Sequence, residues 1–136
     1  MLGRKPAGLA SLFGALEVRV LEALWARGGE STVRDLLDAF PAAAYTTVMT
    51  TMDRLHRKGV LDRRRDGRAF LYRPRHSREQ LESLVVARAL EPLLSGGNAR
   101  PILSCLVEEV SRCDEKLLEE LERIVREKRK QQGPRR

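Results

Sequence analysis

The fold is decided by residues 45–74, which read YTTVMTTMDRLHRKGVLDRRRDGRAFLYRP. Before Gly59, residues 44–58 have the pattern of an amphipathic helix when successive residues are placed about 100° apart. One face is apolar apart from one threonine and comprises Val48, Thr51, Met52 and Leu55. The opposite face comprises Thr46, Met49, Thr50, Asp53 and Arg57, with Arg54 at its edge. The pattern predicts a helix that buries the first face and exposes the second.

Two short runs follow this helix, over residues 60–65 and 68–73, with Asp66 and Gly67 between them. An Asp-Gly pair between runs of β-branched, aromatic or long side chains is typical of a type I′ β-hairpin. Pro74 ends the second run. The segment is strongly basic and carries Arg63, Arg64, Arg65, Arg68, Arg73 and Arg75 against Asp62 and Asp66.

Two more helices are expected before the quoted segment. Over residues 15–27, apolar side chains recur at the spacing of one buried helical face, and two glycines stop that helix. Ser31 or Thr32 is a suitable N-cap for a short second helix. Three helices closed by a hairpin form the winged helix-turn-helix arrangement. It places the third helix in the major groove of DNA and the hairpin, or wing, against the flanking backbone.

Three helices are also expected after the hairpin. Ser77 and Gln80 have the spacing of a capping box and open a helix that runs to about residue 94. A second helix starts near residue 99, and Asp114 can cap a third. The predicted fold is mainly α with a small β-hairpin: a winged helix-turn-helix domain followed by a helical dimerisation domain. The expected parts are a flexible arm (1–14), the DNA-binding domain (15–76), the dimerisation domain (77–130) and a basic tail (131–136).

The charge of the chain favours a polyanionic partner. The chain has 136 residues, 42% of them hydrophobic, which suffices for a folded core. Its 26 Lys and Arg against 19 Asp and Glu give a net charge of +7. Residues 31–76 carry ten basic and five acidic side chains, whereas residues 77–127 carry seven and eleven. The basic region coincides with the predicted winged helix, so we expect it to bind double-stranded DNA.

The threonines of the third helix need an explanation, because β-branched residues lower helix propensity. Their hydroxyls can bond phosphates or base edges, and Met49 or a threonine methyl can contact a thymine methyl. The alternative is that Thr51 packs inside and the others form a solvated face. The arginines of the hairpin have the same alternative, a solvated basic loop.

The three C-terminal helices are amphipathic and follow a complete small domain. They have little core of their own, so their apolar seams need a partner surface. A second copy of the chain is the simplest partner, and twofold symmetry then requires an inverted-repeat DNA site. The alternative is that these helices pack back on their own N-terminal domain. The candidate dimerisation residues are Leu84, Ile102, Leu106, Val110, Leu117, Leu118, Leu121, Ile124 and Val125.

Other classes of function find little support in the sequence. No apolar stretch reaches the ~18 residues of a transmembrane helix, so we expect a cytoplasmic protein without membrane insertion. His56 and His76 lack a nucleophile or carboxylate at an interpretable spacing, and no Gly-rich phosphate loop is present, which argues against an enzyme. Cys105 and Cys113 lack the spacing of a zinc site, and we expect neither metal nor cofactor. On one helix they would lie roughly 12 Å apart, too far for a disulfide.

The quoted segment resembles the BlaI/MecI penicillinase-repressor family, as do LEVRVLEALWARG (16–28), TVRDLL (32–37) and the Gly-Gly pair followed by two helices. The resemblance covers residues 14–127. It implies a homodimeric winged-helix repressor of β-lactamase or related antibiotic-resistance genes that binds inverted-repeat operators of the TACA/TGTA type. The copper-responsive CopY branch ends in a Cys-x-Cys…Cys-x-Cys metal site, whereas the tail KRKQQGPRR has no cysteine, which argues against copper sensing.

Induction in that family follows cleavage of the repressor in its C-terminal region, brought about by a membrane-bound sensor metalloprotease. The resemblance places the scissile bond near Cys105–Leu106, where characterised members have an asparagine before the bond. It places recognition-helix contacts on Thr46, Thr47, Met49 and Thr50, and staphylococcal members have lysine and arginine at the positions of Thr46 and Met49. The candidate DNA-contacting residues are Thr32, Thr46, Thr47, Met49, Thr50, Arg54, Arg57, Arg65 and Arg68.

Two alternatives remain open at this point. One is a protein-interaction module whose helical half binds another polypeptide and whose basic half docks on an acidic partner. A stable monomer without DNA affinity would favour it. The other is a redox- or metal-responsive repressor that uses Cys105 or Cys113, for which oxidant or zinc would change the affinity for DNA.

Overall fold

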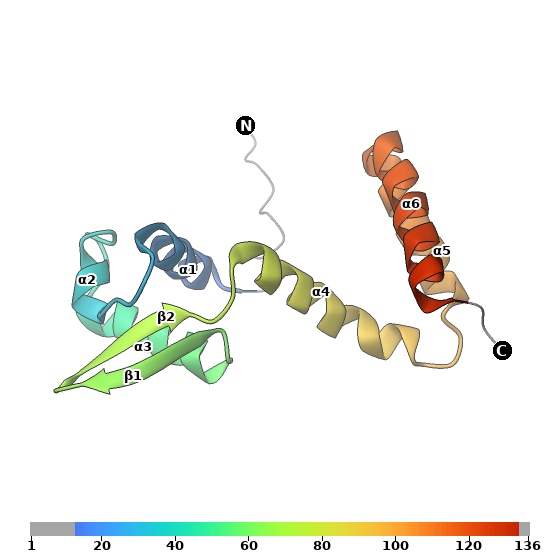
Figure 1. Cartoon of the computed structure of the whole chain (residues 1–136). Coiled ribbons are helices and arrows are strands. Elements are labelled where there is room, and N and C mark those ends of the chain that lie inside the picture. The colour runs from blue at the N-terminus through green and yellow to red at the C-terminus, as the bar shows by residue number, and fades with distance from the viewer. Residues whose placement is uncertain (1–12, 134–136) are drawn as a thin grey trace. The chain divides into compact units, whose positions relative to one another are not determined.

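The structure is a computed structural model that describes residues 13–133, so most of the predicted arm and the end of the predicted tail lie outside the described residues. Its elements are α1 (Ala15–Arg27), α2 (Val33–Leu37), α3 (Tyr45–Arg57), β1 (Leu61–Asp66), β2 (Ala69–Pro74), α4 (Arg78–Leu94), α5 (Arg100–Cys113) and α6 (Glu115–Gln132) (Figure 1). The predicted fold class is confirmed, since a winged helix-turn-helix is followed by a helical part. The chain divides within α4 into two compact units, Met1–Val86 and Ala87–Arg136.

The short helix α2 begins at a complete capping box. Thr32 is the N-cap: its hydroxyl oxygen accepts a hydrogen bond from the Asp35 backbone N–H at 3.1 Å, and the Asp35 carboxylate accepts from the Thr32 N–H at 2.9 Å. Ser31, the other candidate, has a different role. Its backbone exchanges two hydrogen bonds with Tyr72 of β2, at 2.9 and 2.8 Å, and so ties the start of α2 to the hairpin.

The hairpin forms as predicted, but the predicted turn type is wrong. Asp66 pairs with Ala69 in the antiparallel register, so the two central residues of the turn are Gly67 and Arg68. Gly67 has φ of 64°, and among the described residues only glycines have positive φ. A type I′ turn needs positive φ at both central positions, whereas type II′ needs it at the first alone. The hairpin therefore turns through a glycine-first, type II′ arrangement, one residue later than the sequence suggests.

The first unit holds the hydrophobic core. Its fully or almost fully buried apolar residues come from α1, α2, α3, the hairpin and the start of α4, and are Val18, Val20, Leu21, Leu24, Val33, Leu36, Phe40, Val48, Met52, Leu55, Val60, Leu61, Tyr72 and Leu81. Burial of one such Val, Leu, Phe or Met stabilises a fold by about 1.5–3 kcal/mol relative to exposure. This shared core fixes α3 against the hairpin.

The first turn of α4 is also attached to this core. The Trp25 indole N–H of α1 donates a 2.9 Å hydrogen bond to the His76 carbonyl oxygen. The Arg78 guanidinium lies 4.9 Å from the centre of the Trp25 ring and pairs with Glu22 at 3.0 Å. Leu81 then enters the core. The start of α4 is thereby packed against α1.

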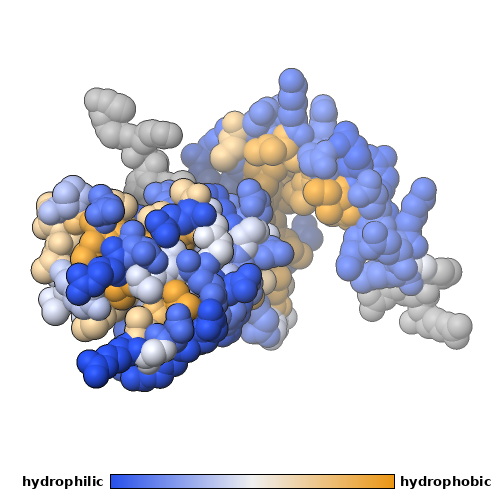
Figure 2. Space-filling view, turned by 60° about the vertical axis from the view of Figure 1, so that its left-hand side comes forward, coloured by the Kyte–Doolittle hydropathy of each residue, from blue (hydrophilic) through white to orange (hydrophobic). Residues whose placement is uncertain are grey.

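The second unit has a different character. α5 and α6 pack against each other, yet no described residue from Ala87 onward is fully buried. Figure 2 shows hydrophobic side chains on the surface of this helical pair. Asp114 caps α6 as predicted, with its carboxylate accepting from the Lys116 N–H at 3.0 Å. Cys105 and Cys113 both lie on α5 as free, exposed thiols.

Candidate nucleic-acid interface

The two faces of α3 are as the sequence predicts. Val48, Thr51, Met52 and Leu55 are buried, and the Thr51 hydroxyl donates to the Thr47 carbonyl oxygen at 2.8 Å. The hydroxyl-bearing residues Thr46, Thr47 and Thr50 remain exposed, and Met49 is 40% exposed. This exposed row has three hydroxyls that can donate or accept and one thioether, which suits contact with phosphates and base edges.

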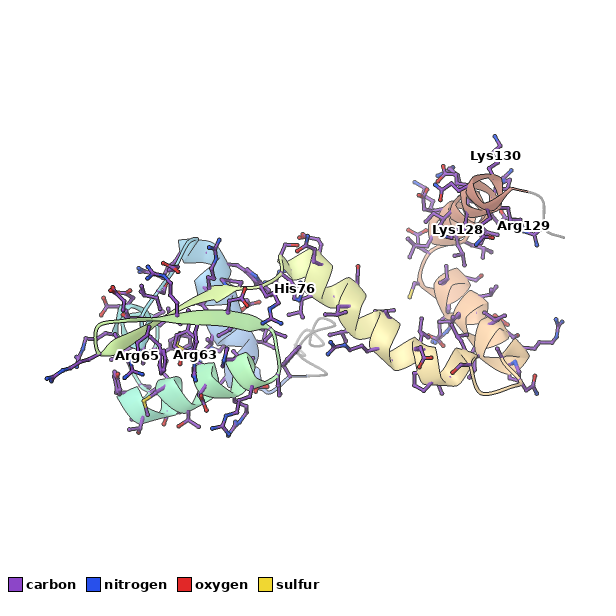
Figure 3. The ribbon with its side chains drawn as sticks, turned by 60° about the horizontal axis from the view of Figure 1, so that its bottom comes forward. Arg63, Arg65, His76, Lys128, Arg129 and Lys130 are labelled. Carbon is purple, nitrogen blue, oxygen red and sulfur yellow. The ribbon has the colours of Figure 1, made fainter. Side chains whose placement is uncertain are left out.

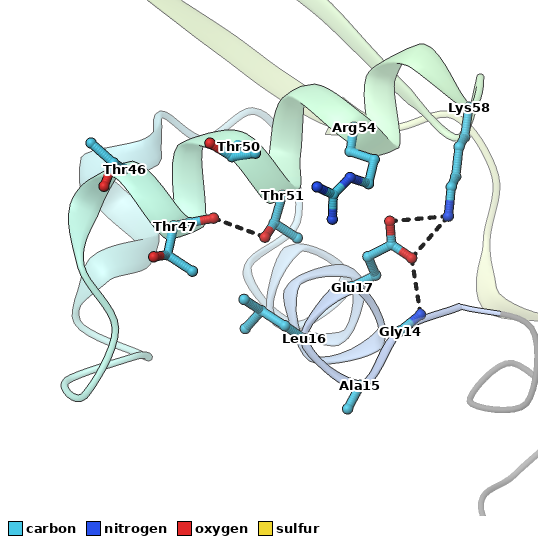
Figure 4. A pocket seen from close by; sticks show the side chains of 10 residues that line it. All are labelled: Gly14, Ala15, Leu16, Glu17, Thr46, Thr47, Thr50, Thr51, Arg54 and Lys58. Atoms are coloured by element: carbon cyan, nitrogen blue, oxygen red, sulfur yellow. Dashed lines mark hydrogen bonds and ion pairs between the residues drawn. The ribbon is translucent and has the colours of Figure 1, made fainter.

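A groove lies beside this row, between α3 and the first turn of α1 (Figure 4). It is lined by Thr46, Thr47, Thr50, Thr51, Arg54 and Lys58 on one side and by Gly14, Ala15, Leu16 and Glu17 on the other. The Glu17 carboxylate accepts two hydrogen bonds from the Lys58 ammonium, at 2.9 and 3.0 Å. The positive charge of Lys58 is thereby paired with the negative charge of Glu17. Arg54 forms no ion pair with any residue in the range 13–133, so its charge is available to a bound anion.

Glu17 is a structural residue that the sequence analysis missed. It is only 5% exposed, and its carboxylate also accepts from the Gly14 backbone N–H at 3.0 Å. The position corresponds to the acidic end of a capping box, but Gly14 has no side chain, so the usual Ser/Thr-x-x-Glu signature was absent. The partner Lys58 is 41 residues away and could not be identified from local spacing.

The arginines of the wing separate into two groups. Three of them form ion pairs within the first unit: Arg63 with Asp53, Arg64 with Glu30 and Arg75 with Asp62, each at 2.8 Å. Arg65, Arg68 and Arg73 have no such partner among the described residues. Arg68 lies in the turn and Arg65 one residue before the end of β1, at the tip of the hairpin, where a wing meets DNA. The unpaired group therefore contains both wing residues that the sequence predicts as DNA contacts.

Two other candidate contacts already have partners. The hydroxyl oxygen of Thr32 serves the N-cap of α2. Arg57 pairs with Asp53 at 3.1 Å, although its side chain is 79% exposed. His56, for which the sequence offers no catalytic partner, is half-buried and not fully on the surface, with Nδ1 3.1 Å from the Leu61 carbonyl oxygen. A carbonyl only accepts, so Nδ1 carries the proton in this contact.

Tyr45 is an exposed residue on α3 that the candidate set omitted. It is the first residue of the helix and 42% exposed, and the Arg34 guanidinium of α2 lies 5.5 Å from its ring centre. A phenol at this position can reach a phosphate in the same way as the neighbouring threonines. The available signal was an aromatic residue directly before the threonine row.

The Glu30–Arg64 pair predicts a pH-dependent contribution to stability. Hydrogen bonds from Arg64 Nε and Nη2, at 2.8 and 2.9 Å, hold the pKa of Glu30 below its ordinary value. A carboxylate whose pKa is lowered on folding stabilises the fold above its unfolded pKa, and the effect is lost as the pH falls through the folded pKa. We expect Glu30→Gln to lower the melting temperature slightly near neutral pH and not at all in strong acid.

The measurement is the melting temperature of the wild-type chain and of Glu30→Gln, determined at a series of pH values from neutral to strongly acidic. Asp38→Asn is the control, because Asp38 is an exposed carboxylate without an ion pair among residues 13–133, so this substitution removes the same charge without breaking a pair. A Glu30→Gln difference that stays constant from neutral to acidic pH would contradict the expectation.

The predicted dimerisation residues lie on α4, α5 and α6. Leu106, Leu117, Ile124 and Val125 are exposed by 36–50%. Leu84, Ile102, Val110, Leu118 and Leu121 are half-buried. Leu118, Leu121 and Val125 line a groove with Val107 along the α5–α6 pair. Part of the seam therefore holds these two helices together, and the rest is directed to solvent.

Two further features of the described residues bear on metal binding and on membrane crossing. No group of three or more His, Cys, Asp or Glu within residues 13–133 is arranged to hold a metal ion. In the same range, none of the helices combines the length and apolar composition needed to cross a membrane.

Comparisons with known proteins found a matching family model, similar sequences and a solved structure. A family model described as "Penicillinase repressor" matches residues 13–127. Two relatives from Mycobacterium tuberculosis, of strains CDC 1551 / Oshkosh and ATCC 25618 / H37Rv, are each described as "Transcriptional regulator BlaI". Each is 38% identical over 100 residues, which cover 71% of this chain and 72% of the relative. A crystal structure of M. tuberculosis Rv0081 aligns with a TM-score of 0.44 and 29% identity, over 65% of this chain and 86% of that one.

Proposed function

The chain belongs to the penicillinase repressor family, and on this basis we propose that it is a homodimeric transcriptional repressor that binds inverted-repeat operators in double-stranded DNA. The observation that carries the proposal is the exposed row of Thr46, Thr47, Met49 and Thr50 on α3, beside a wing whose Arg65 and Arg68 have no ion-pair partner among residues 13–133. The row supplies base and phosphate contacts, and the wing supplies charge against the flanking backbone.

Dimerisation is supported by the second unit. Its α5–α6 pair has no fully buried residue, and large apolar side chains such as Leu103, Leu117 and Ile124 are about half exposed. Soluble proteins rarely leave a contiguous apolar surface uncovered unless a partner binds it. A second copy would cover this surface and pair two α3 helices for two half-sites about one helical turn of DNA, ~34 Å, or a multiple apart.

The direct test is fluorescence anisotropy with a labelled inverted-repeat duplex of the TACA/TGTA type, at several salt concentrations. About four phosphate contacts per subunit predict a slope of log K against log salt near −3 to −4 per subunit. We expect tight, salt-sensitive binding at ~100 mM salt that a shuffled duplex of equal length does not reproduce. Absence of binding, or binding indifferent to salt, would overturn the proposal.

Relief of repression by proteolysis is the second part of the proposal, with a membrane-bound sensor metalloprotease as partner. Cys105 and Leu106 are exposed on α5, but a protease needs an extended backbone, so the helix must open locally first. A helix without fully buried residues opens at low cost. Co-expression with such a protease should yield a fragment that ends at or near Cys105, and full-length chain after induction would contradict this route.

Base preference should depend on the exposed row of α3. We expect Met49→Ala or Thr50→Ala to lower the preference for one base pair of each half-site. The ratio of the affinities for the preferred and a substituted base pair should fall about tenfold, because a single base-edge contact discriminates by about 1–3 kcal/mol. The measurement is binding to duplexes that each carry one base-pair change. Arg65→Ala is the comparison, since loss of a phosphate contact should weaken all these duplexes alike. An unchanged ranking in Met49→Ala and Thr50→Ala would contradict base contact by this row.

A further inference from the structure

One wing arginine is directed to α3 and not to solvent. Arg63 of β1 donates from Nη1 to the Asp53 carboxylate of α3 at 2.8 Å and to the Tyr72 hydroxyl at 3.3 Å. Its side chain is 24% exposed, and these hydrogen bonds raise the pKa of the guanidinium. Figure 3 shows Arg63 between the hairpin and α3. The pair is a direct polar link between the two elements that are proposed to contact DNA.

An aromatic ring extends this link toward the turn of the wing. The Arg63 guanidinium lies 4.1 Å from the centre of the Phe70 ring, and the Arg65 guanidinium lies 5.2 Å from the same centre. Phe70 meets Tyr72 edge to face, with ring centres 6.2 Å apart. A planar guanidinium stacks well on an aromatic face. Arg65, a proposed phosphate contact, is therefore oriented by the same ring that holds Arg63.

Asp53 also forms an ion pair with Arg57 at 3.1 Å, so one carboxylate joins a candidate contact on α3 to the wing. A negative charge on the exposed face of a DNA-binding helix is repelled by phosphate, so electrostatics alone disfavours it there. We therefore expect Asp53 to have a structural role at this position that offsets the repulsion from phosphate.

We propose that Asp53 and Arg63 are positioning residues: they hold the wing at a fixed geometry relative to α3 and so set the ratio of operator affinity to affinity for unrelated DNA. This inference rests on the proposed function. The pair acts by restricting which duplex shapes satisfy α3 and the wing together. Unrelated DNA is bound mainly through backbone charge, which does not need this geometry.

The proposal predicts that one substitution weakens binding to the operator but not binding to unrelated DNA. Asp53→Asn removes a negative charge of the surface proposed to face DNA, so binding to unrelated DNA should be unchanged or up to threefold tighter. Operator binding should weaken about tenfold, because the wing is no longer held. Both side chains keep some solvent contact, with exposed fractions of 24% and 32%, and the pair lies outside the hydrophobic core, so the chain should stay folded with only a modest change in its melting temperature.

The probes are the tightest duplex that the wild-type chain selects from a randomised library and a shuffled duplex of equal length, both followed by fluorescence anisotropy. Asp62→Asn is the matched control: it also removes the negative charge of an ion pair at 2.8 Å, but neither Asp62 of β1 nor its partner Arg75, just after β2, lies on α3. We expect Asp62→Asn to leave the ratio of the two affinities within about twofold of wild type.

The coupling between the two residues is a further measurement. Arg63→Gln should lower the ratio about tenfold, Arg63→Lys should retain part of it, and Asp53→Asn combined with Arg63→Gln should be no worse than either alone. Parallel changes in both affinities for Asp53→Asn, or multiplicative losses in the double variant, would overturn this proposal alone. A wild-type chain that selects no duplex would overturn the proposed function and this inference with it.

Discussion

Replacing Ile124 by lysine is expected to convert the dimer into a monomer and to weaken operator binding 100-fold or more. Ile124 of α6 is 50% exposed in the single chain, so a lysine there should not disturb the α5–α6 pair. In the dimer the same position would place a charge in an apolar contact, which is strongly unfavourable. A dimer binds its second half-site intramolecularly, a gain of about 10²–10⁴ in affinity that a monomer loses.

Sedimentation velocity and anisotropy on the same samples measure the two effects. Gln131→Lys is the matched control, because it adds the same charge to an exposed polar position of α6. Leu121→Lys would be less informative: Leu121 is half-buried on the α5–α6 groove, so a charge there would also disturb the unit itself. A dimeric Ile124→Lys chain with unchanged operator affinity would exclude this face of α6 from the interface.

The elements of the fold were predictable because their signals are local. The helix over residues 15–27 ends at glycines, the capping box of Ser77 and Gln80 opens α4, and Asp114 caps α6. The buried face of α3 followed from the helical period alone. The turn of the hairpin was misjudged by one residue, because Asp-Gly suits type I′ at its centre while Gly-Arg suits type II′, and strand pairing decides between them.

The ion pairs of the site were not predictable from the sequence. Glu17–Lys58, Glu30–Arg64 and Asp53–Arg63 join residues that are ten or more positions apart, and nothing in local spacing distinguishes a paired arginine from a free one. The distinction matters for function, because it separates arginines that hold the wing in place from those that remain available to phosphate. Fold and candidate residues follow from sequence patterns, but this division of roles needed coordinates.

The arginines without an ion-pair partner should contribute strongly to DNA binding. Combined replacement of Arg65 and Arg68 by alanine should weaken operator binding about 100-fold near ~150 mM salt and reduce the magnitude of the salt slope by about 3 to 4 per dimer. Neither arginine has an ion-pair partner among residues 13–133, so each is available for one phosphate contact per subunit. Each contact contributes about 0.9 to the slope, and a dimer would lose four.

The matched control removes the same charge from β1 and from the residue just after β2. Arg64→Ala with Arg75→Ala deletes two arginines that pair with Glu30 and Asp62, so few counterions should be released through them on binding. We expect the salt slope of this variant to change by less than about 1, even if its affinity falls because two carboxylates lose their partners. Equal changes in the salt slope for the two double variants would mean that the salt dependence of binding follows only the net charge of the wing. The separation into holding and contacting arginines would then be wrong, because ion pairing within the wing would have no influence on which side chains displace counterions.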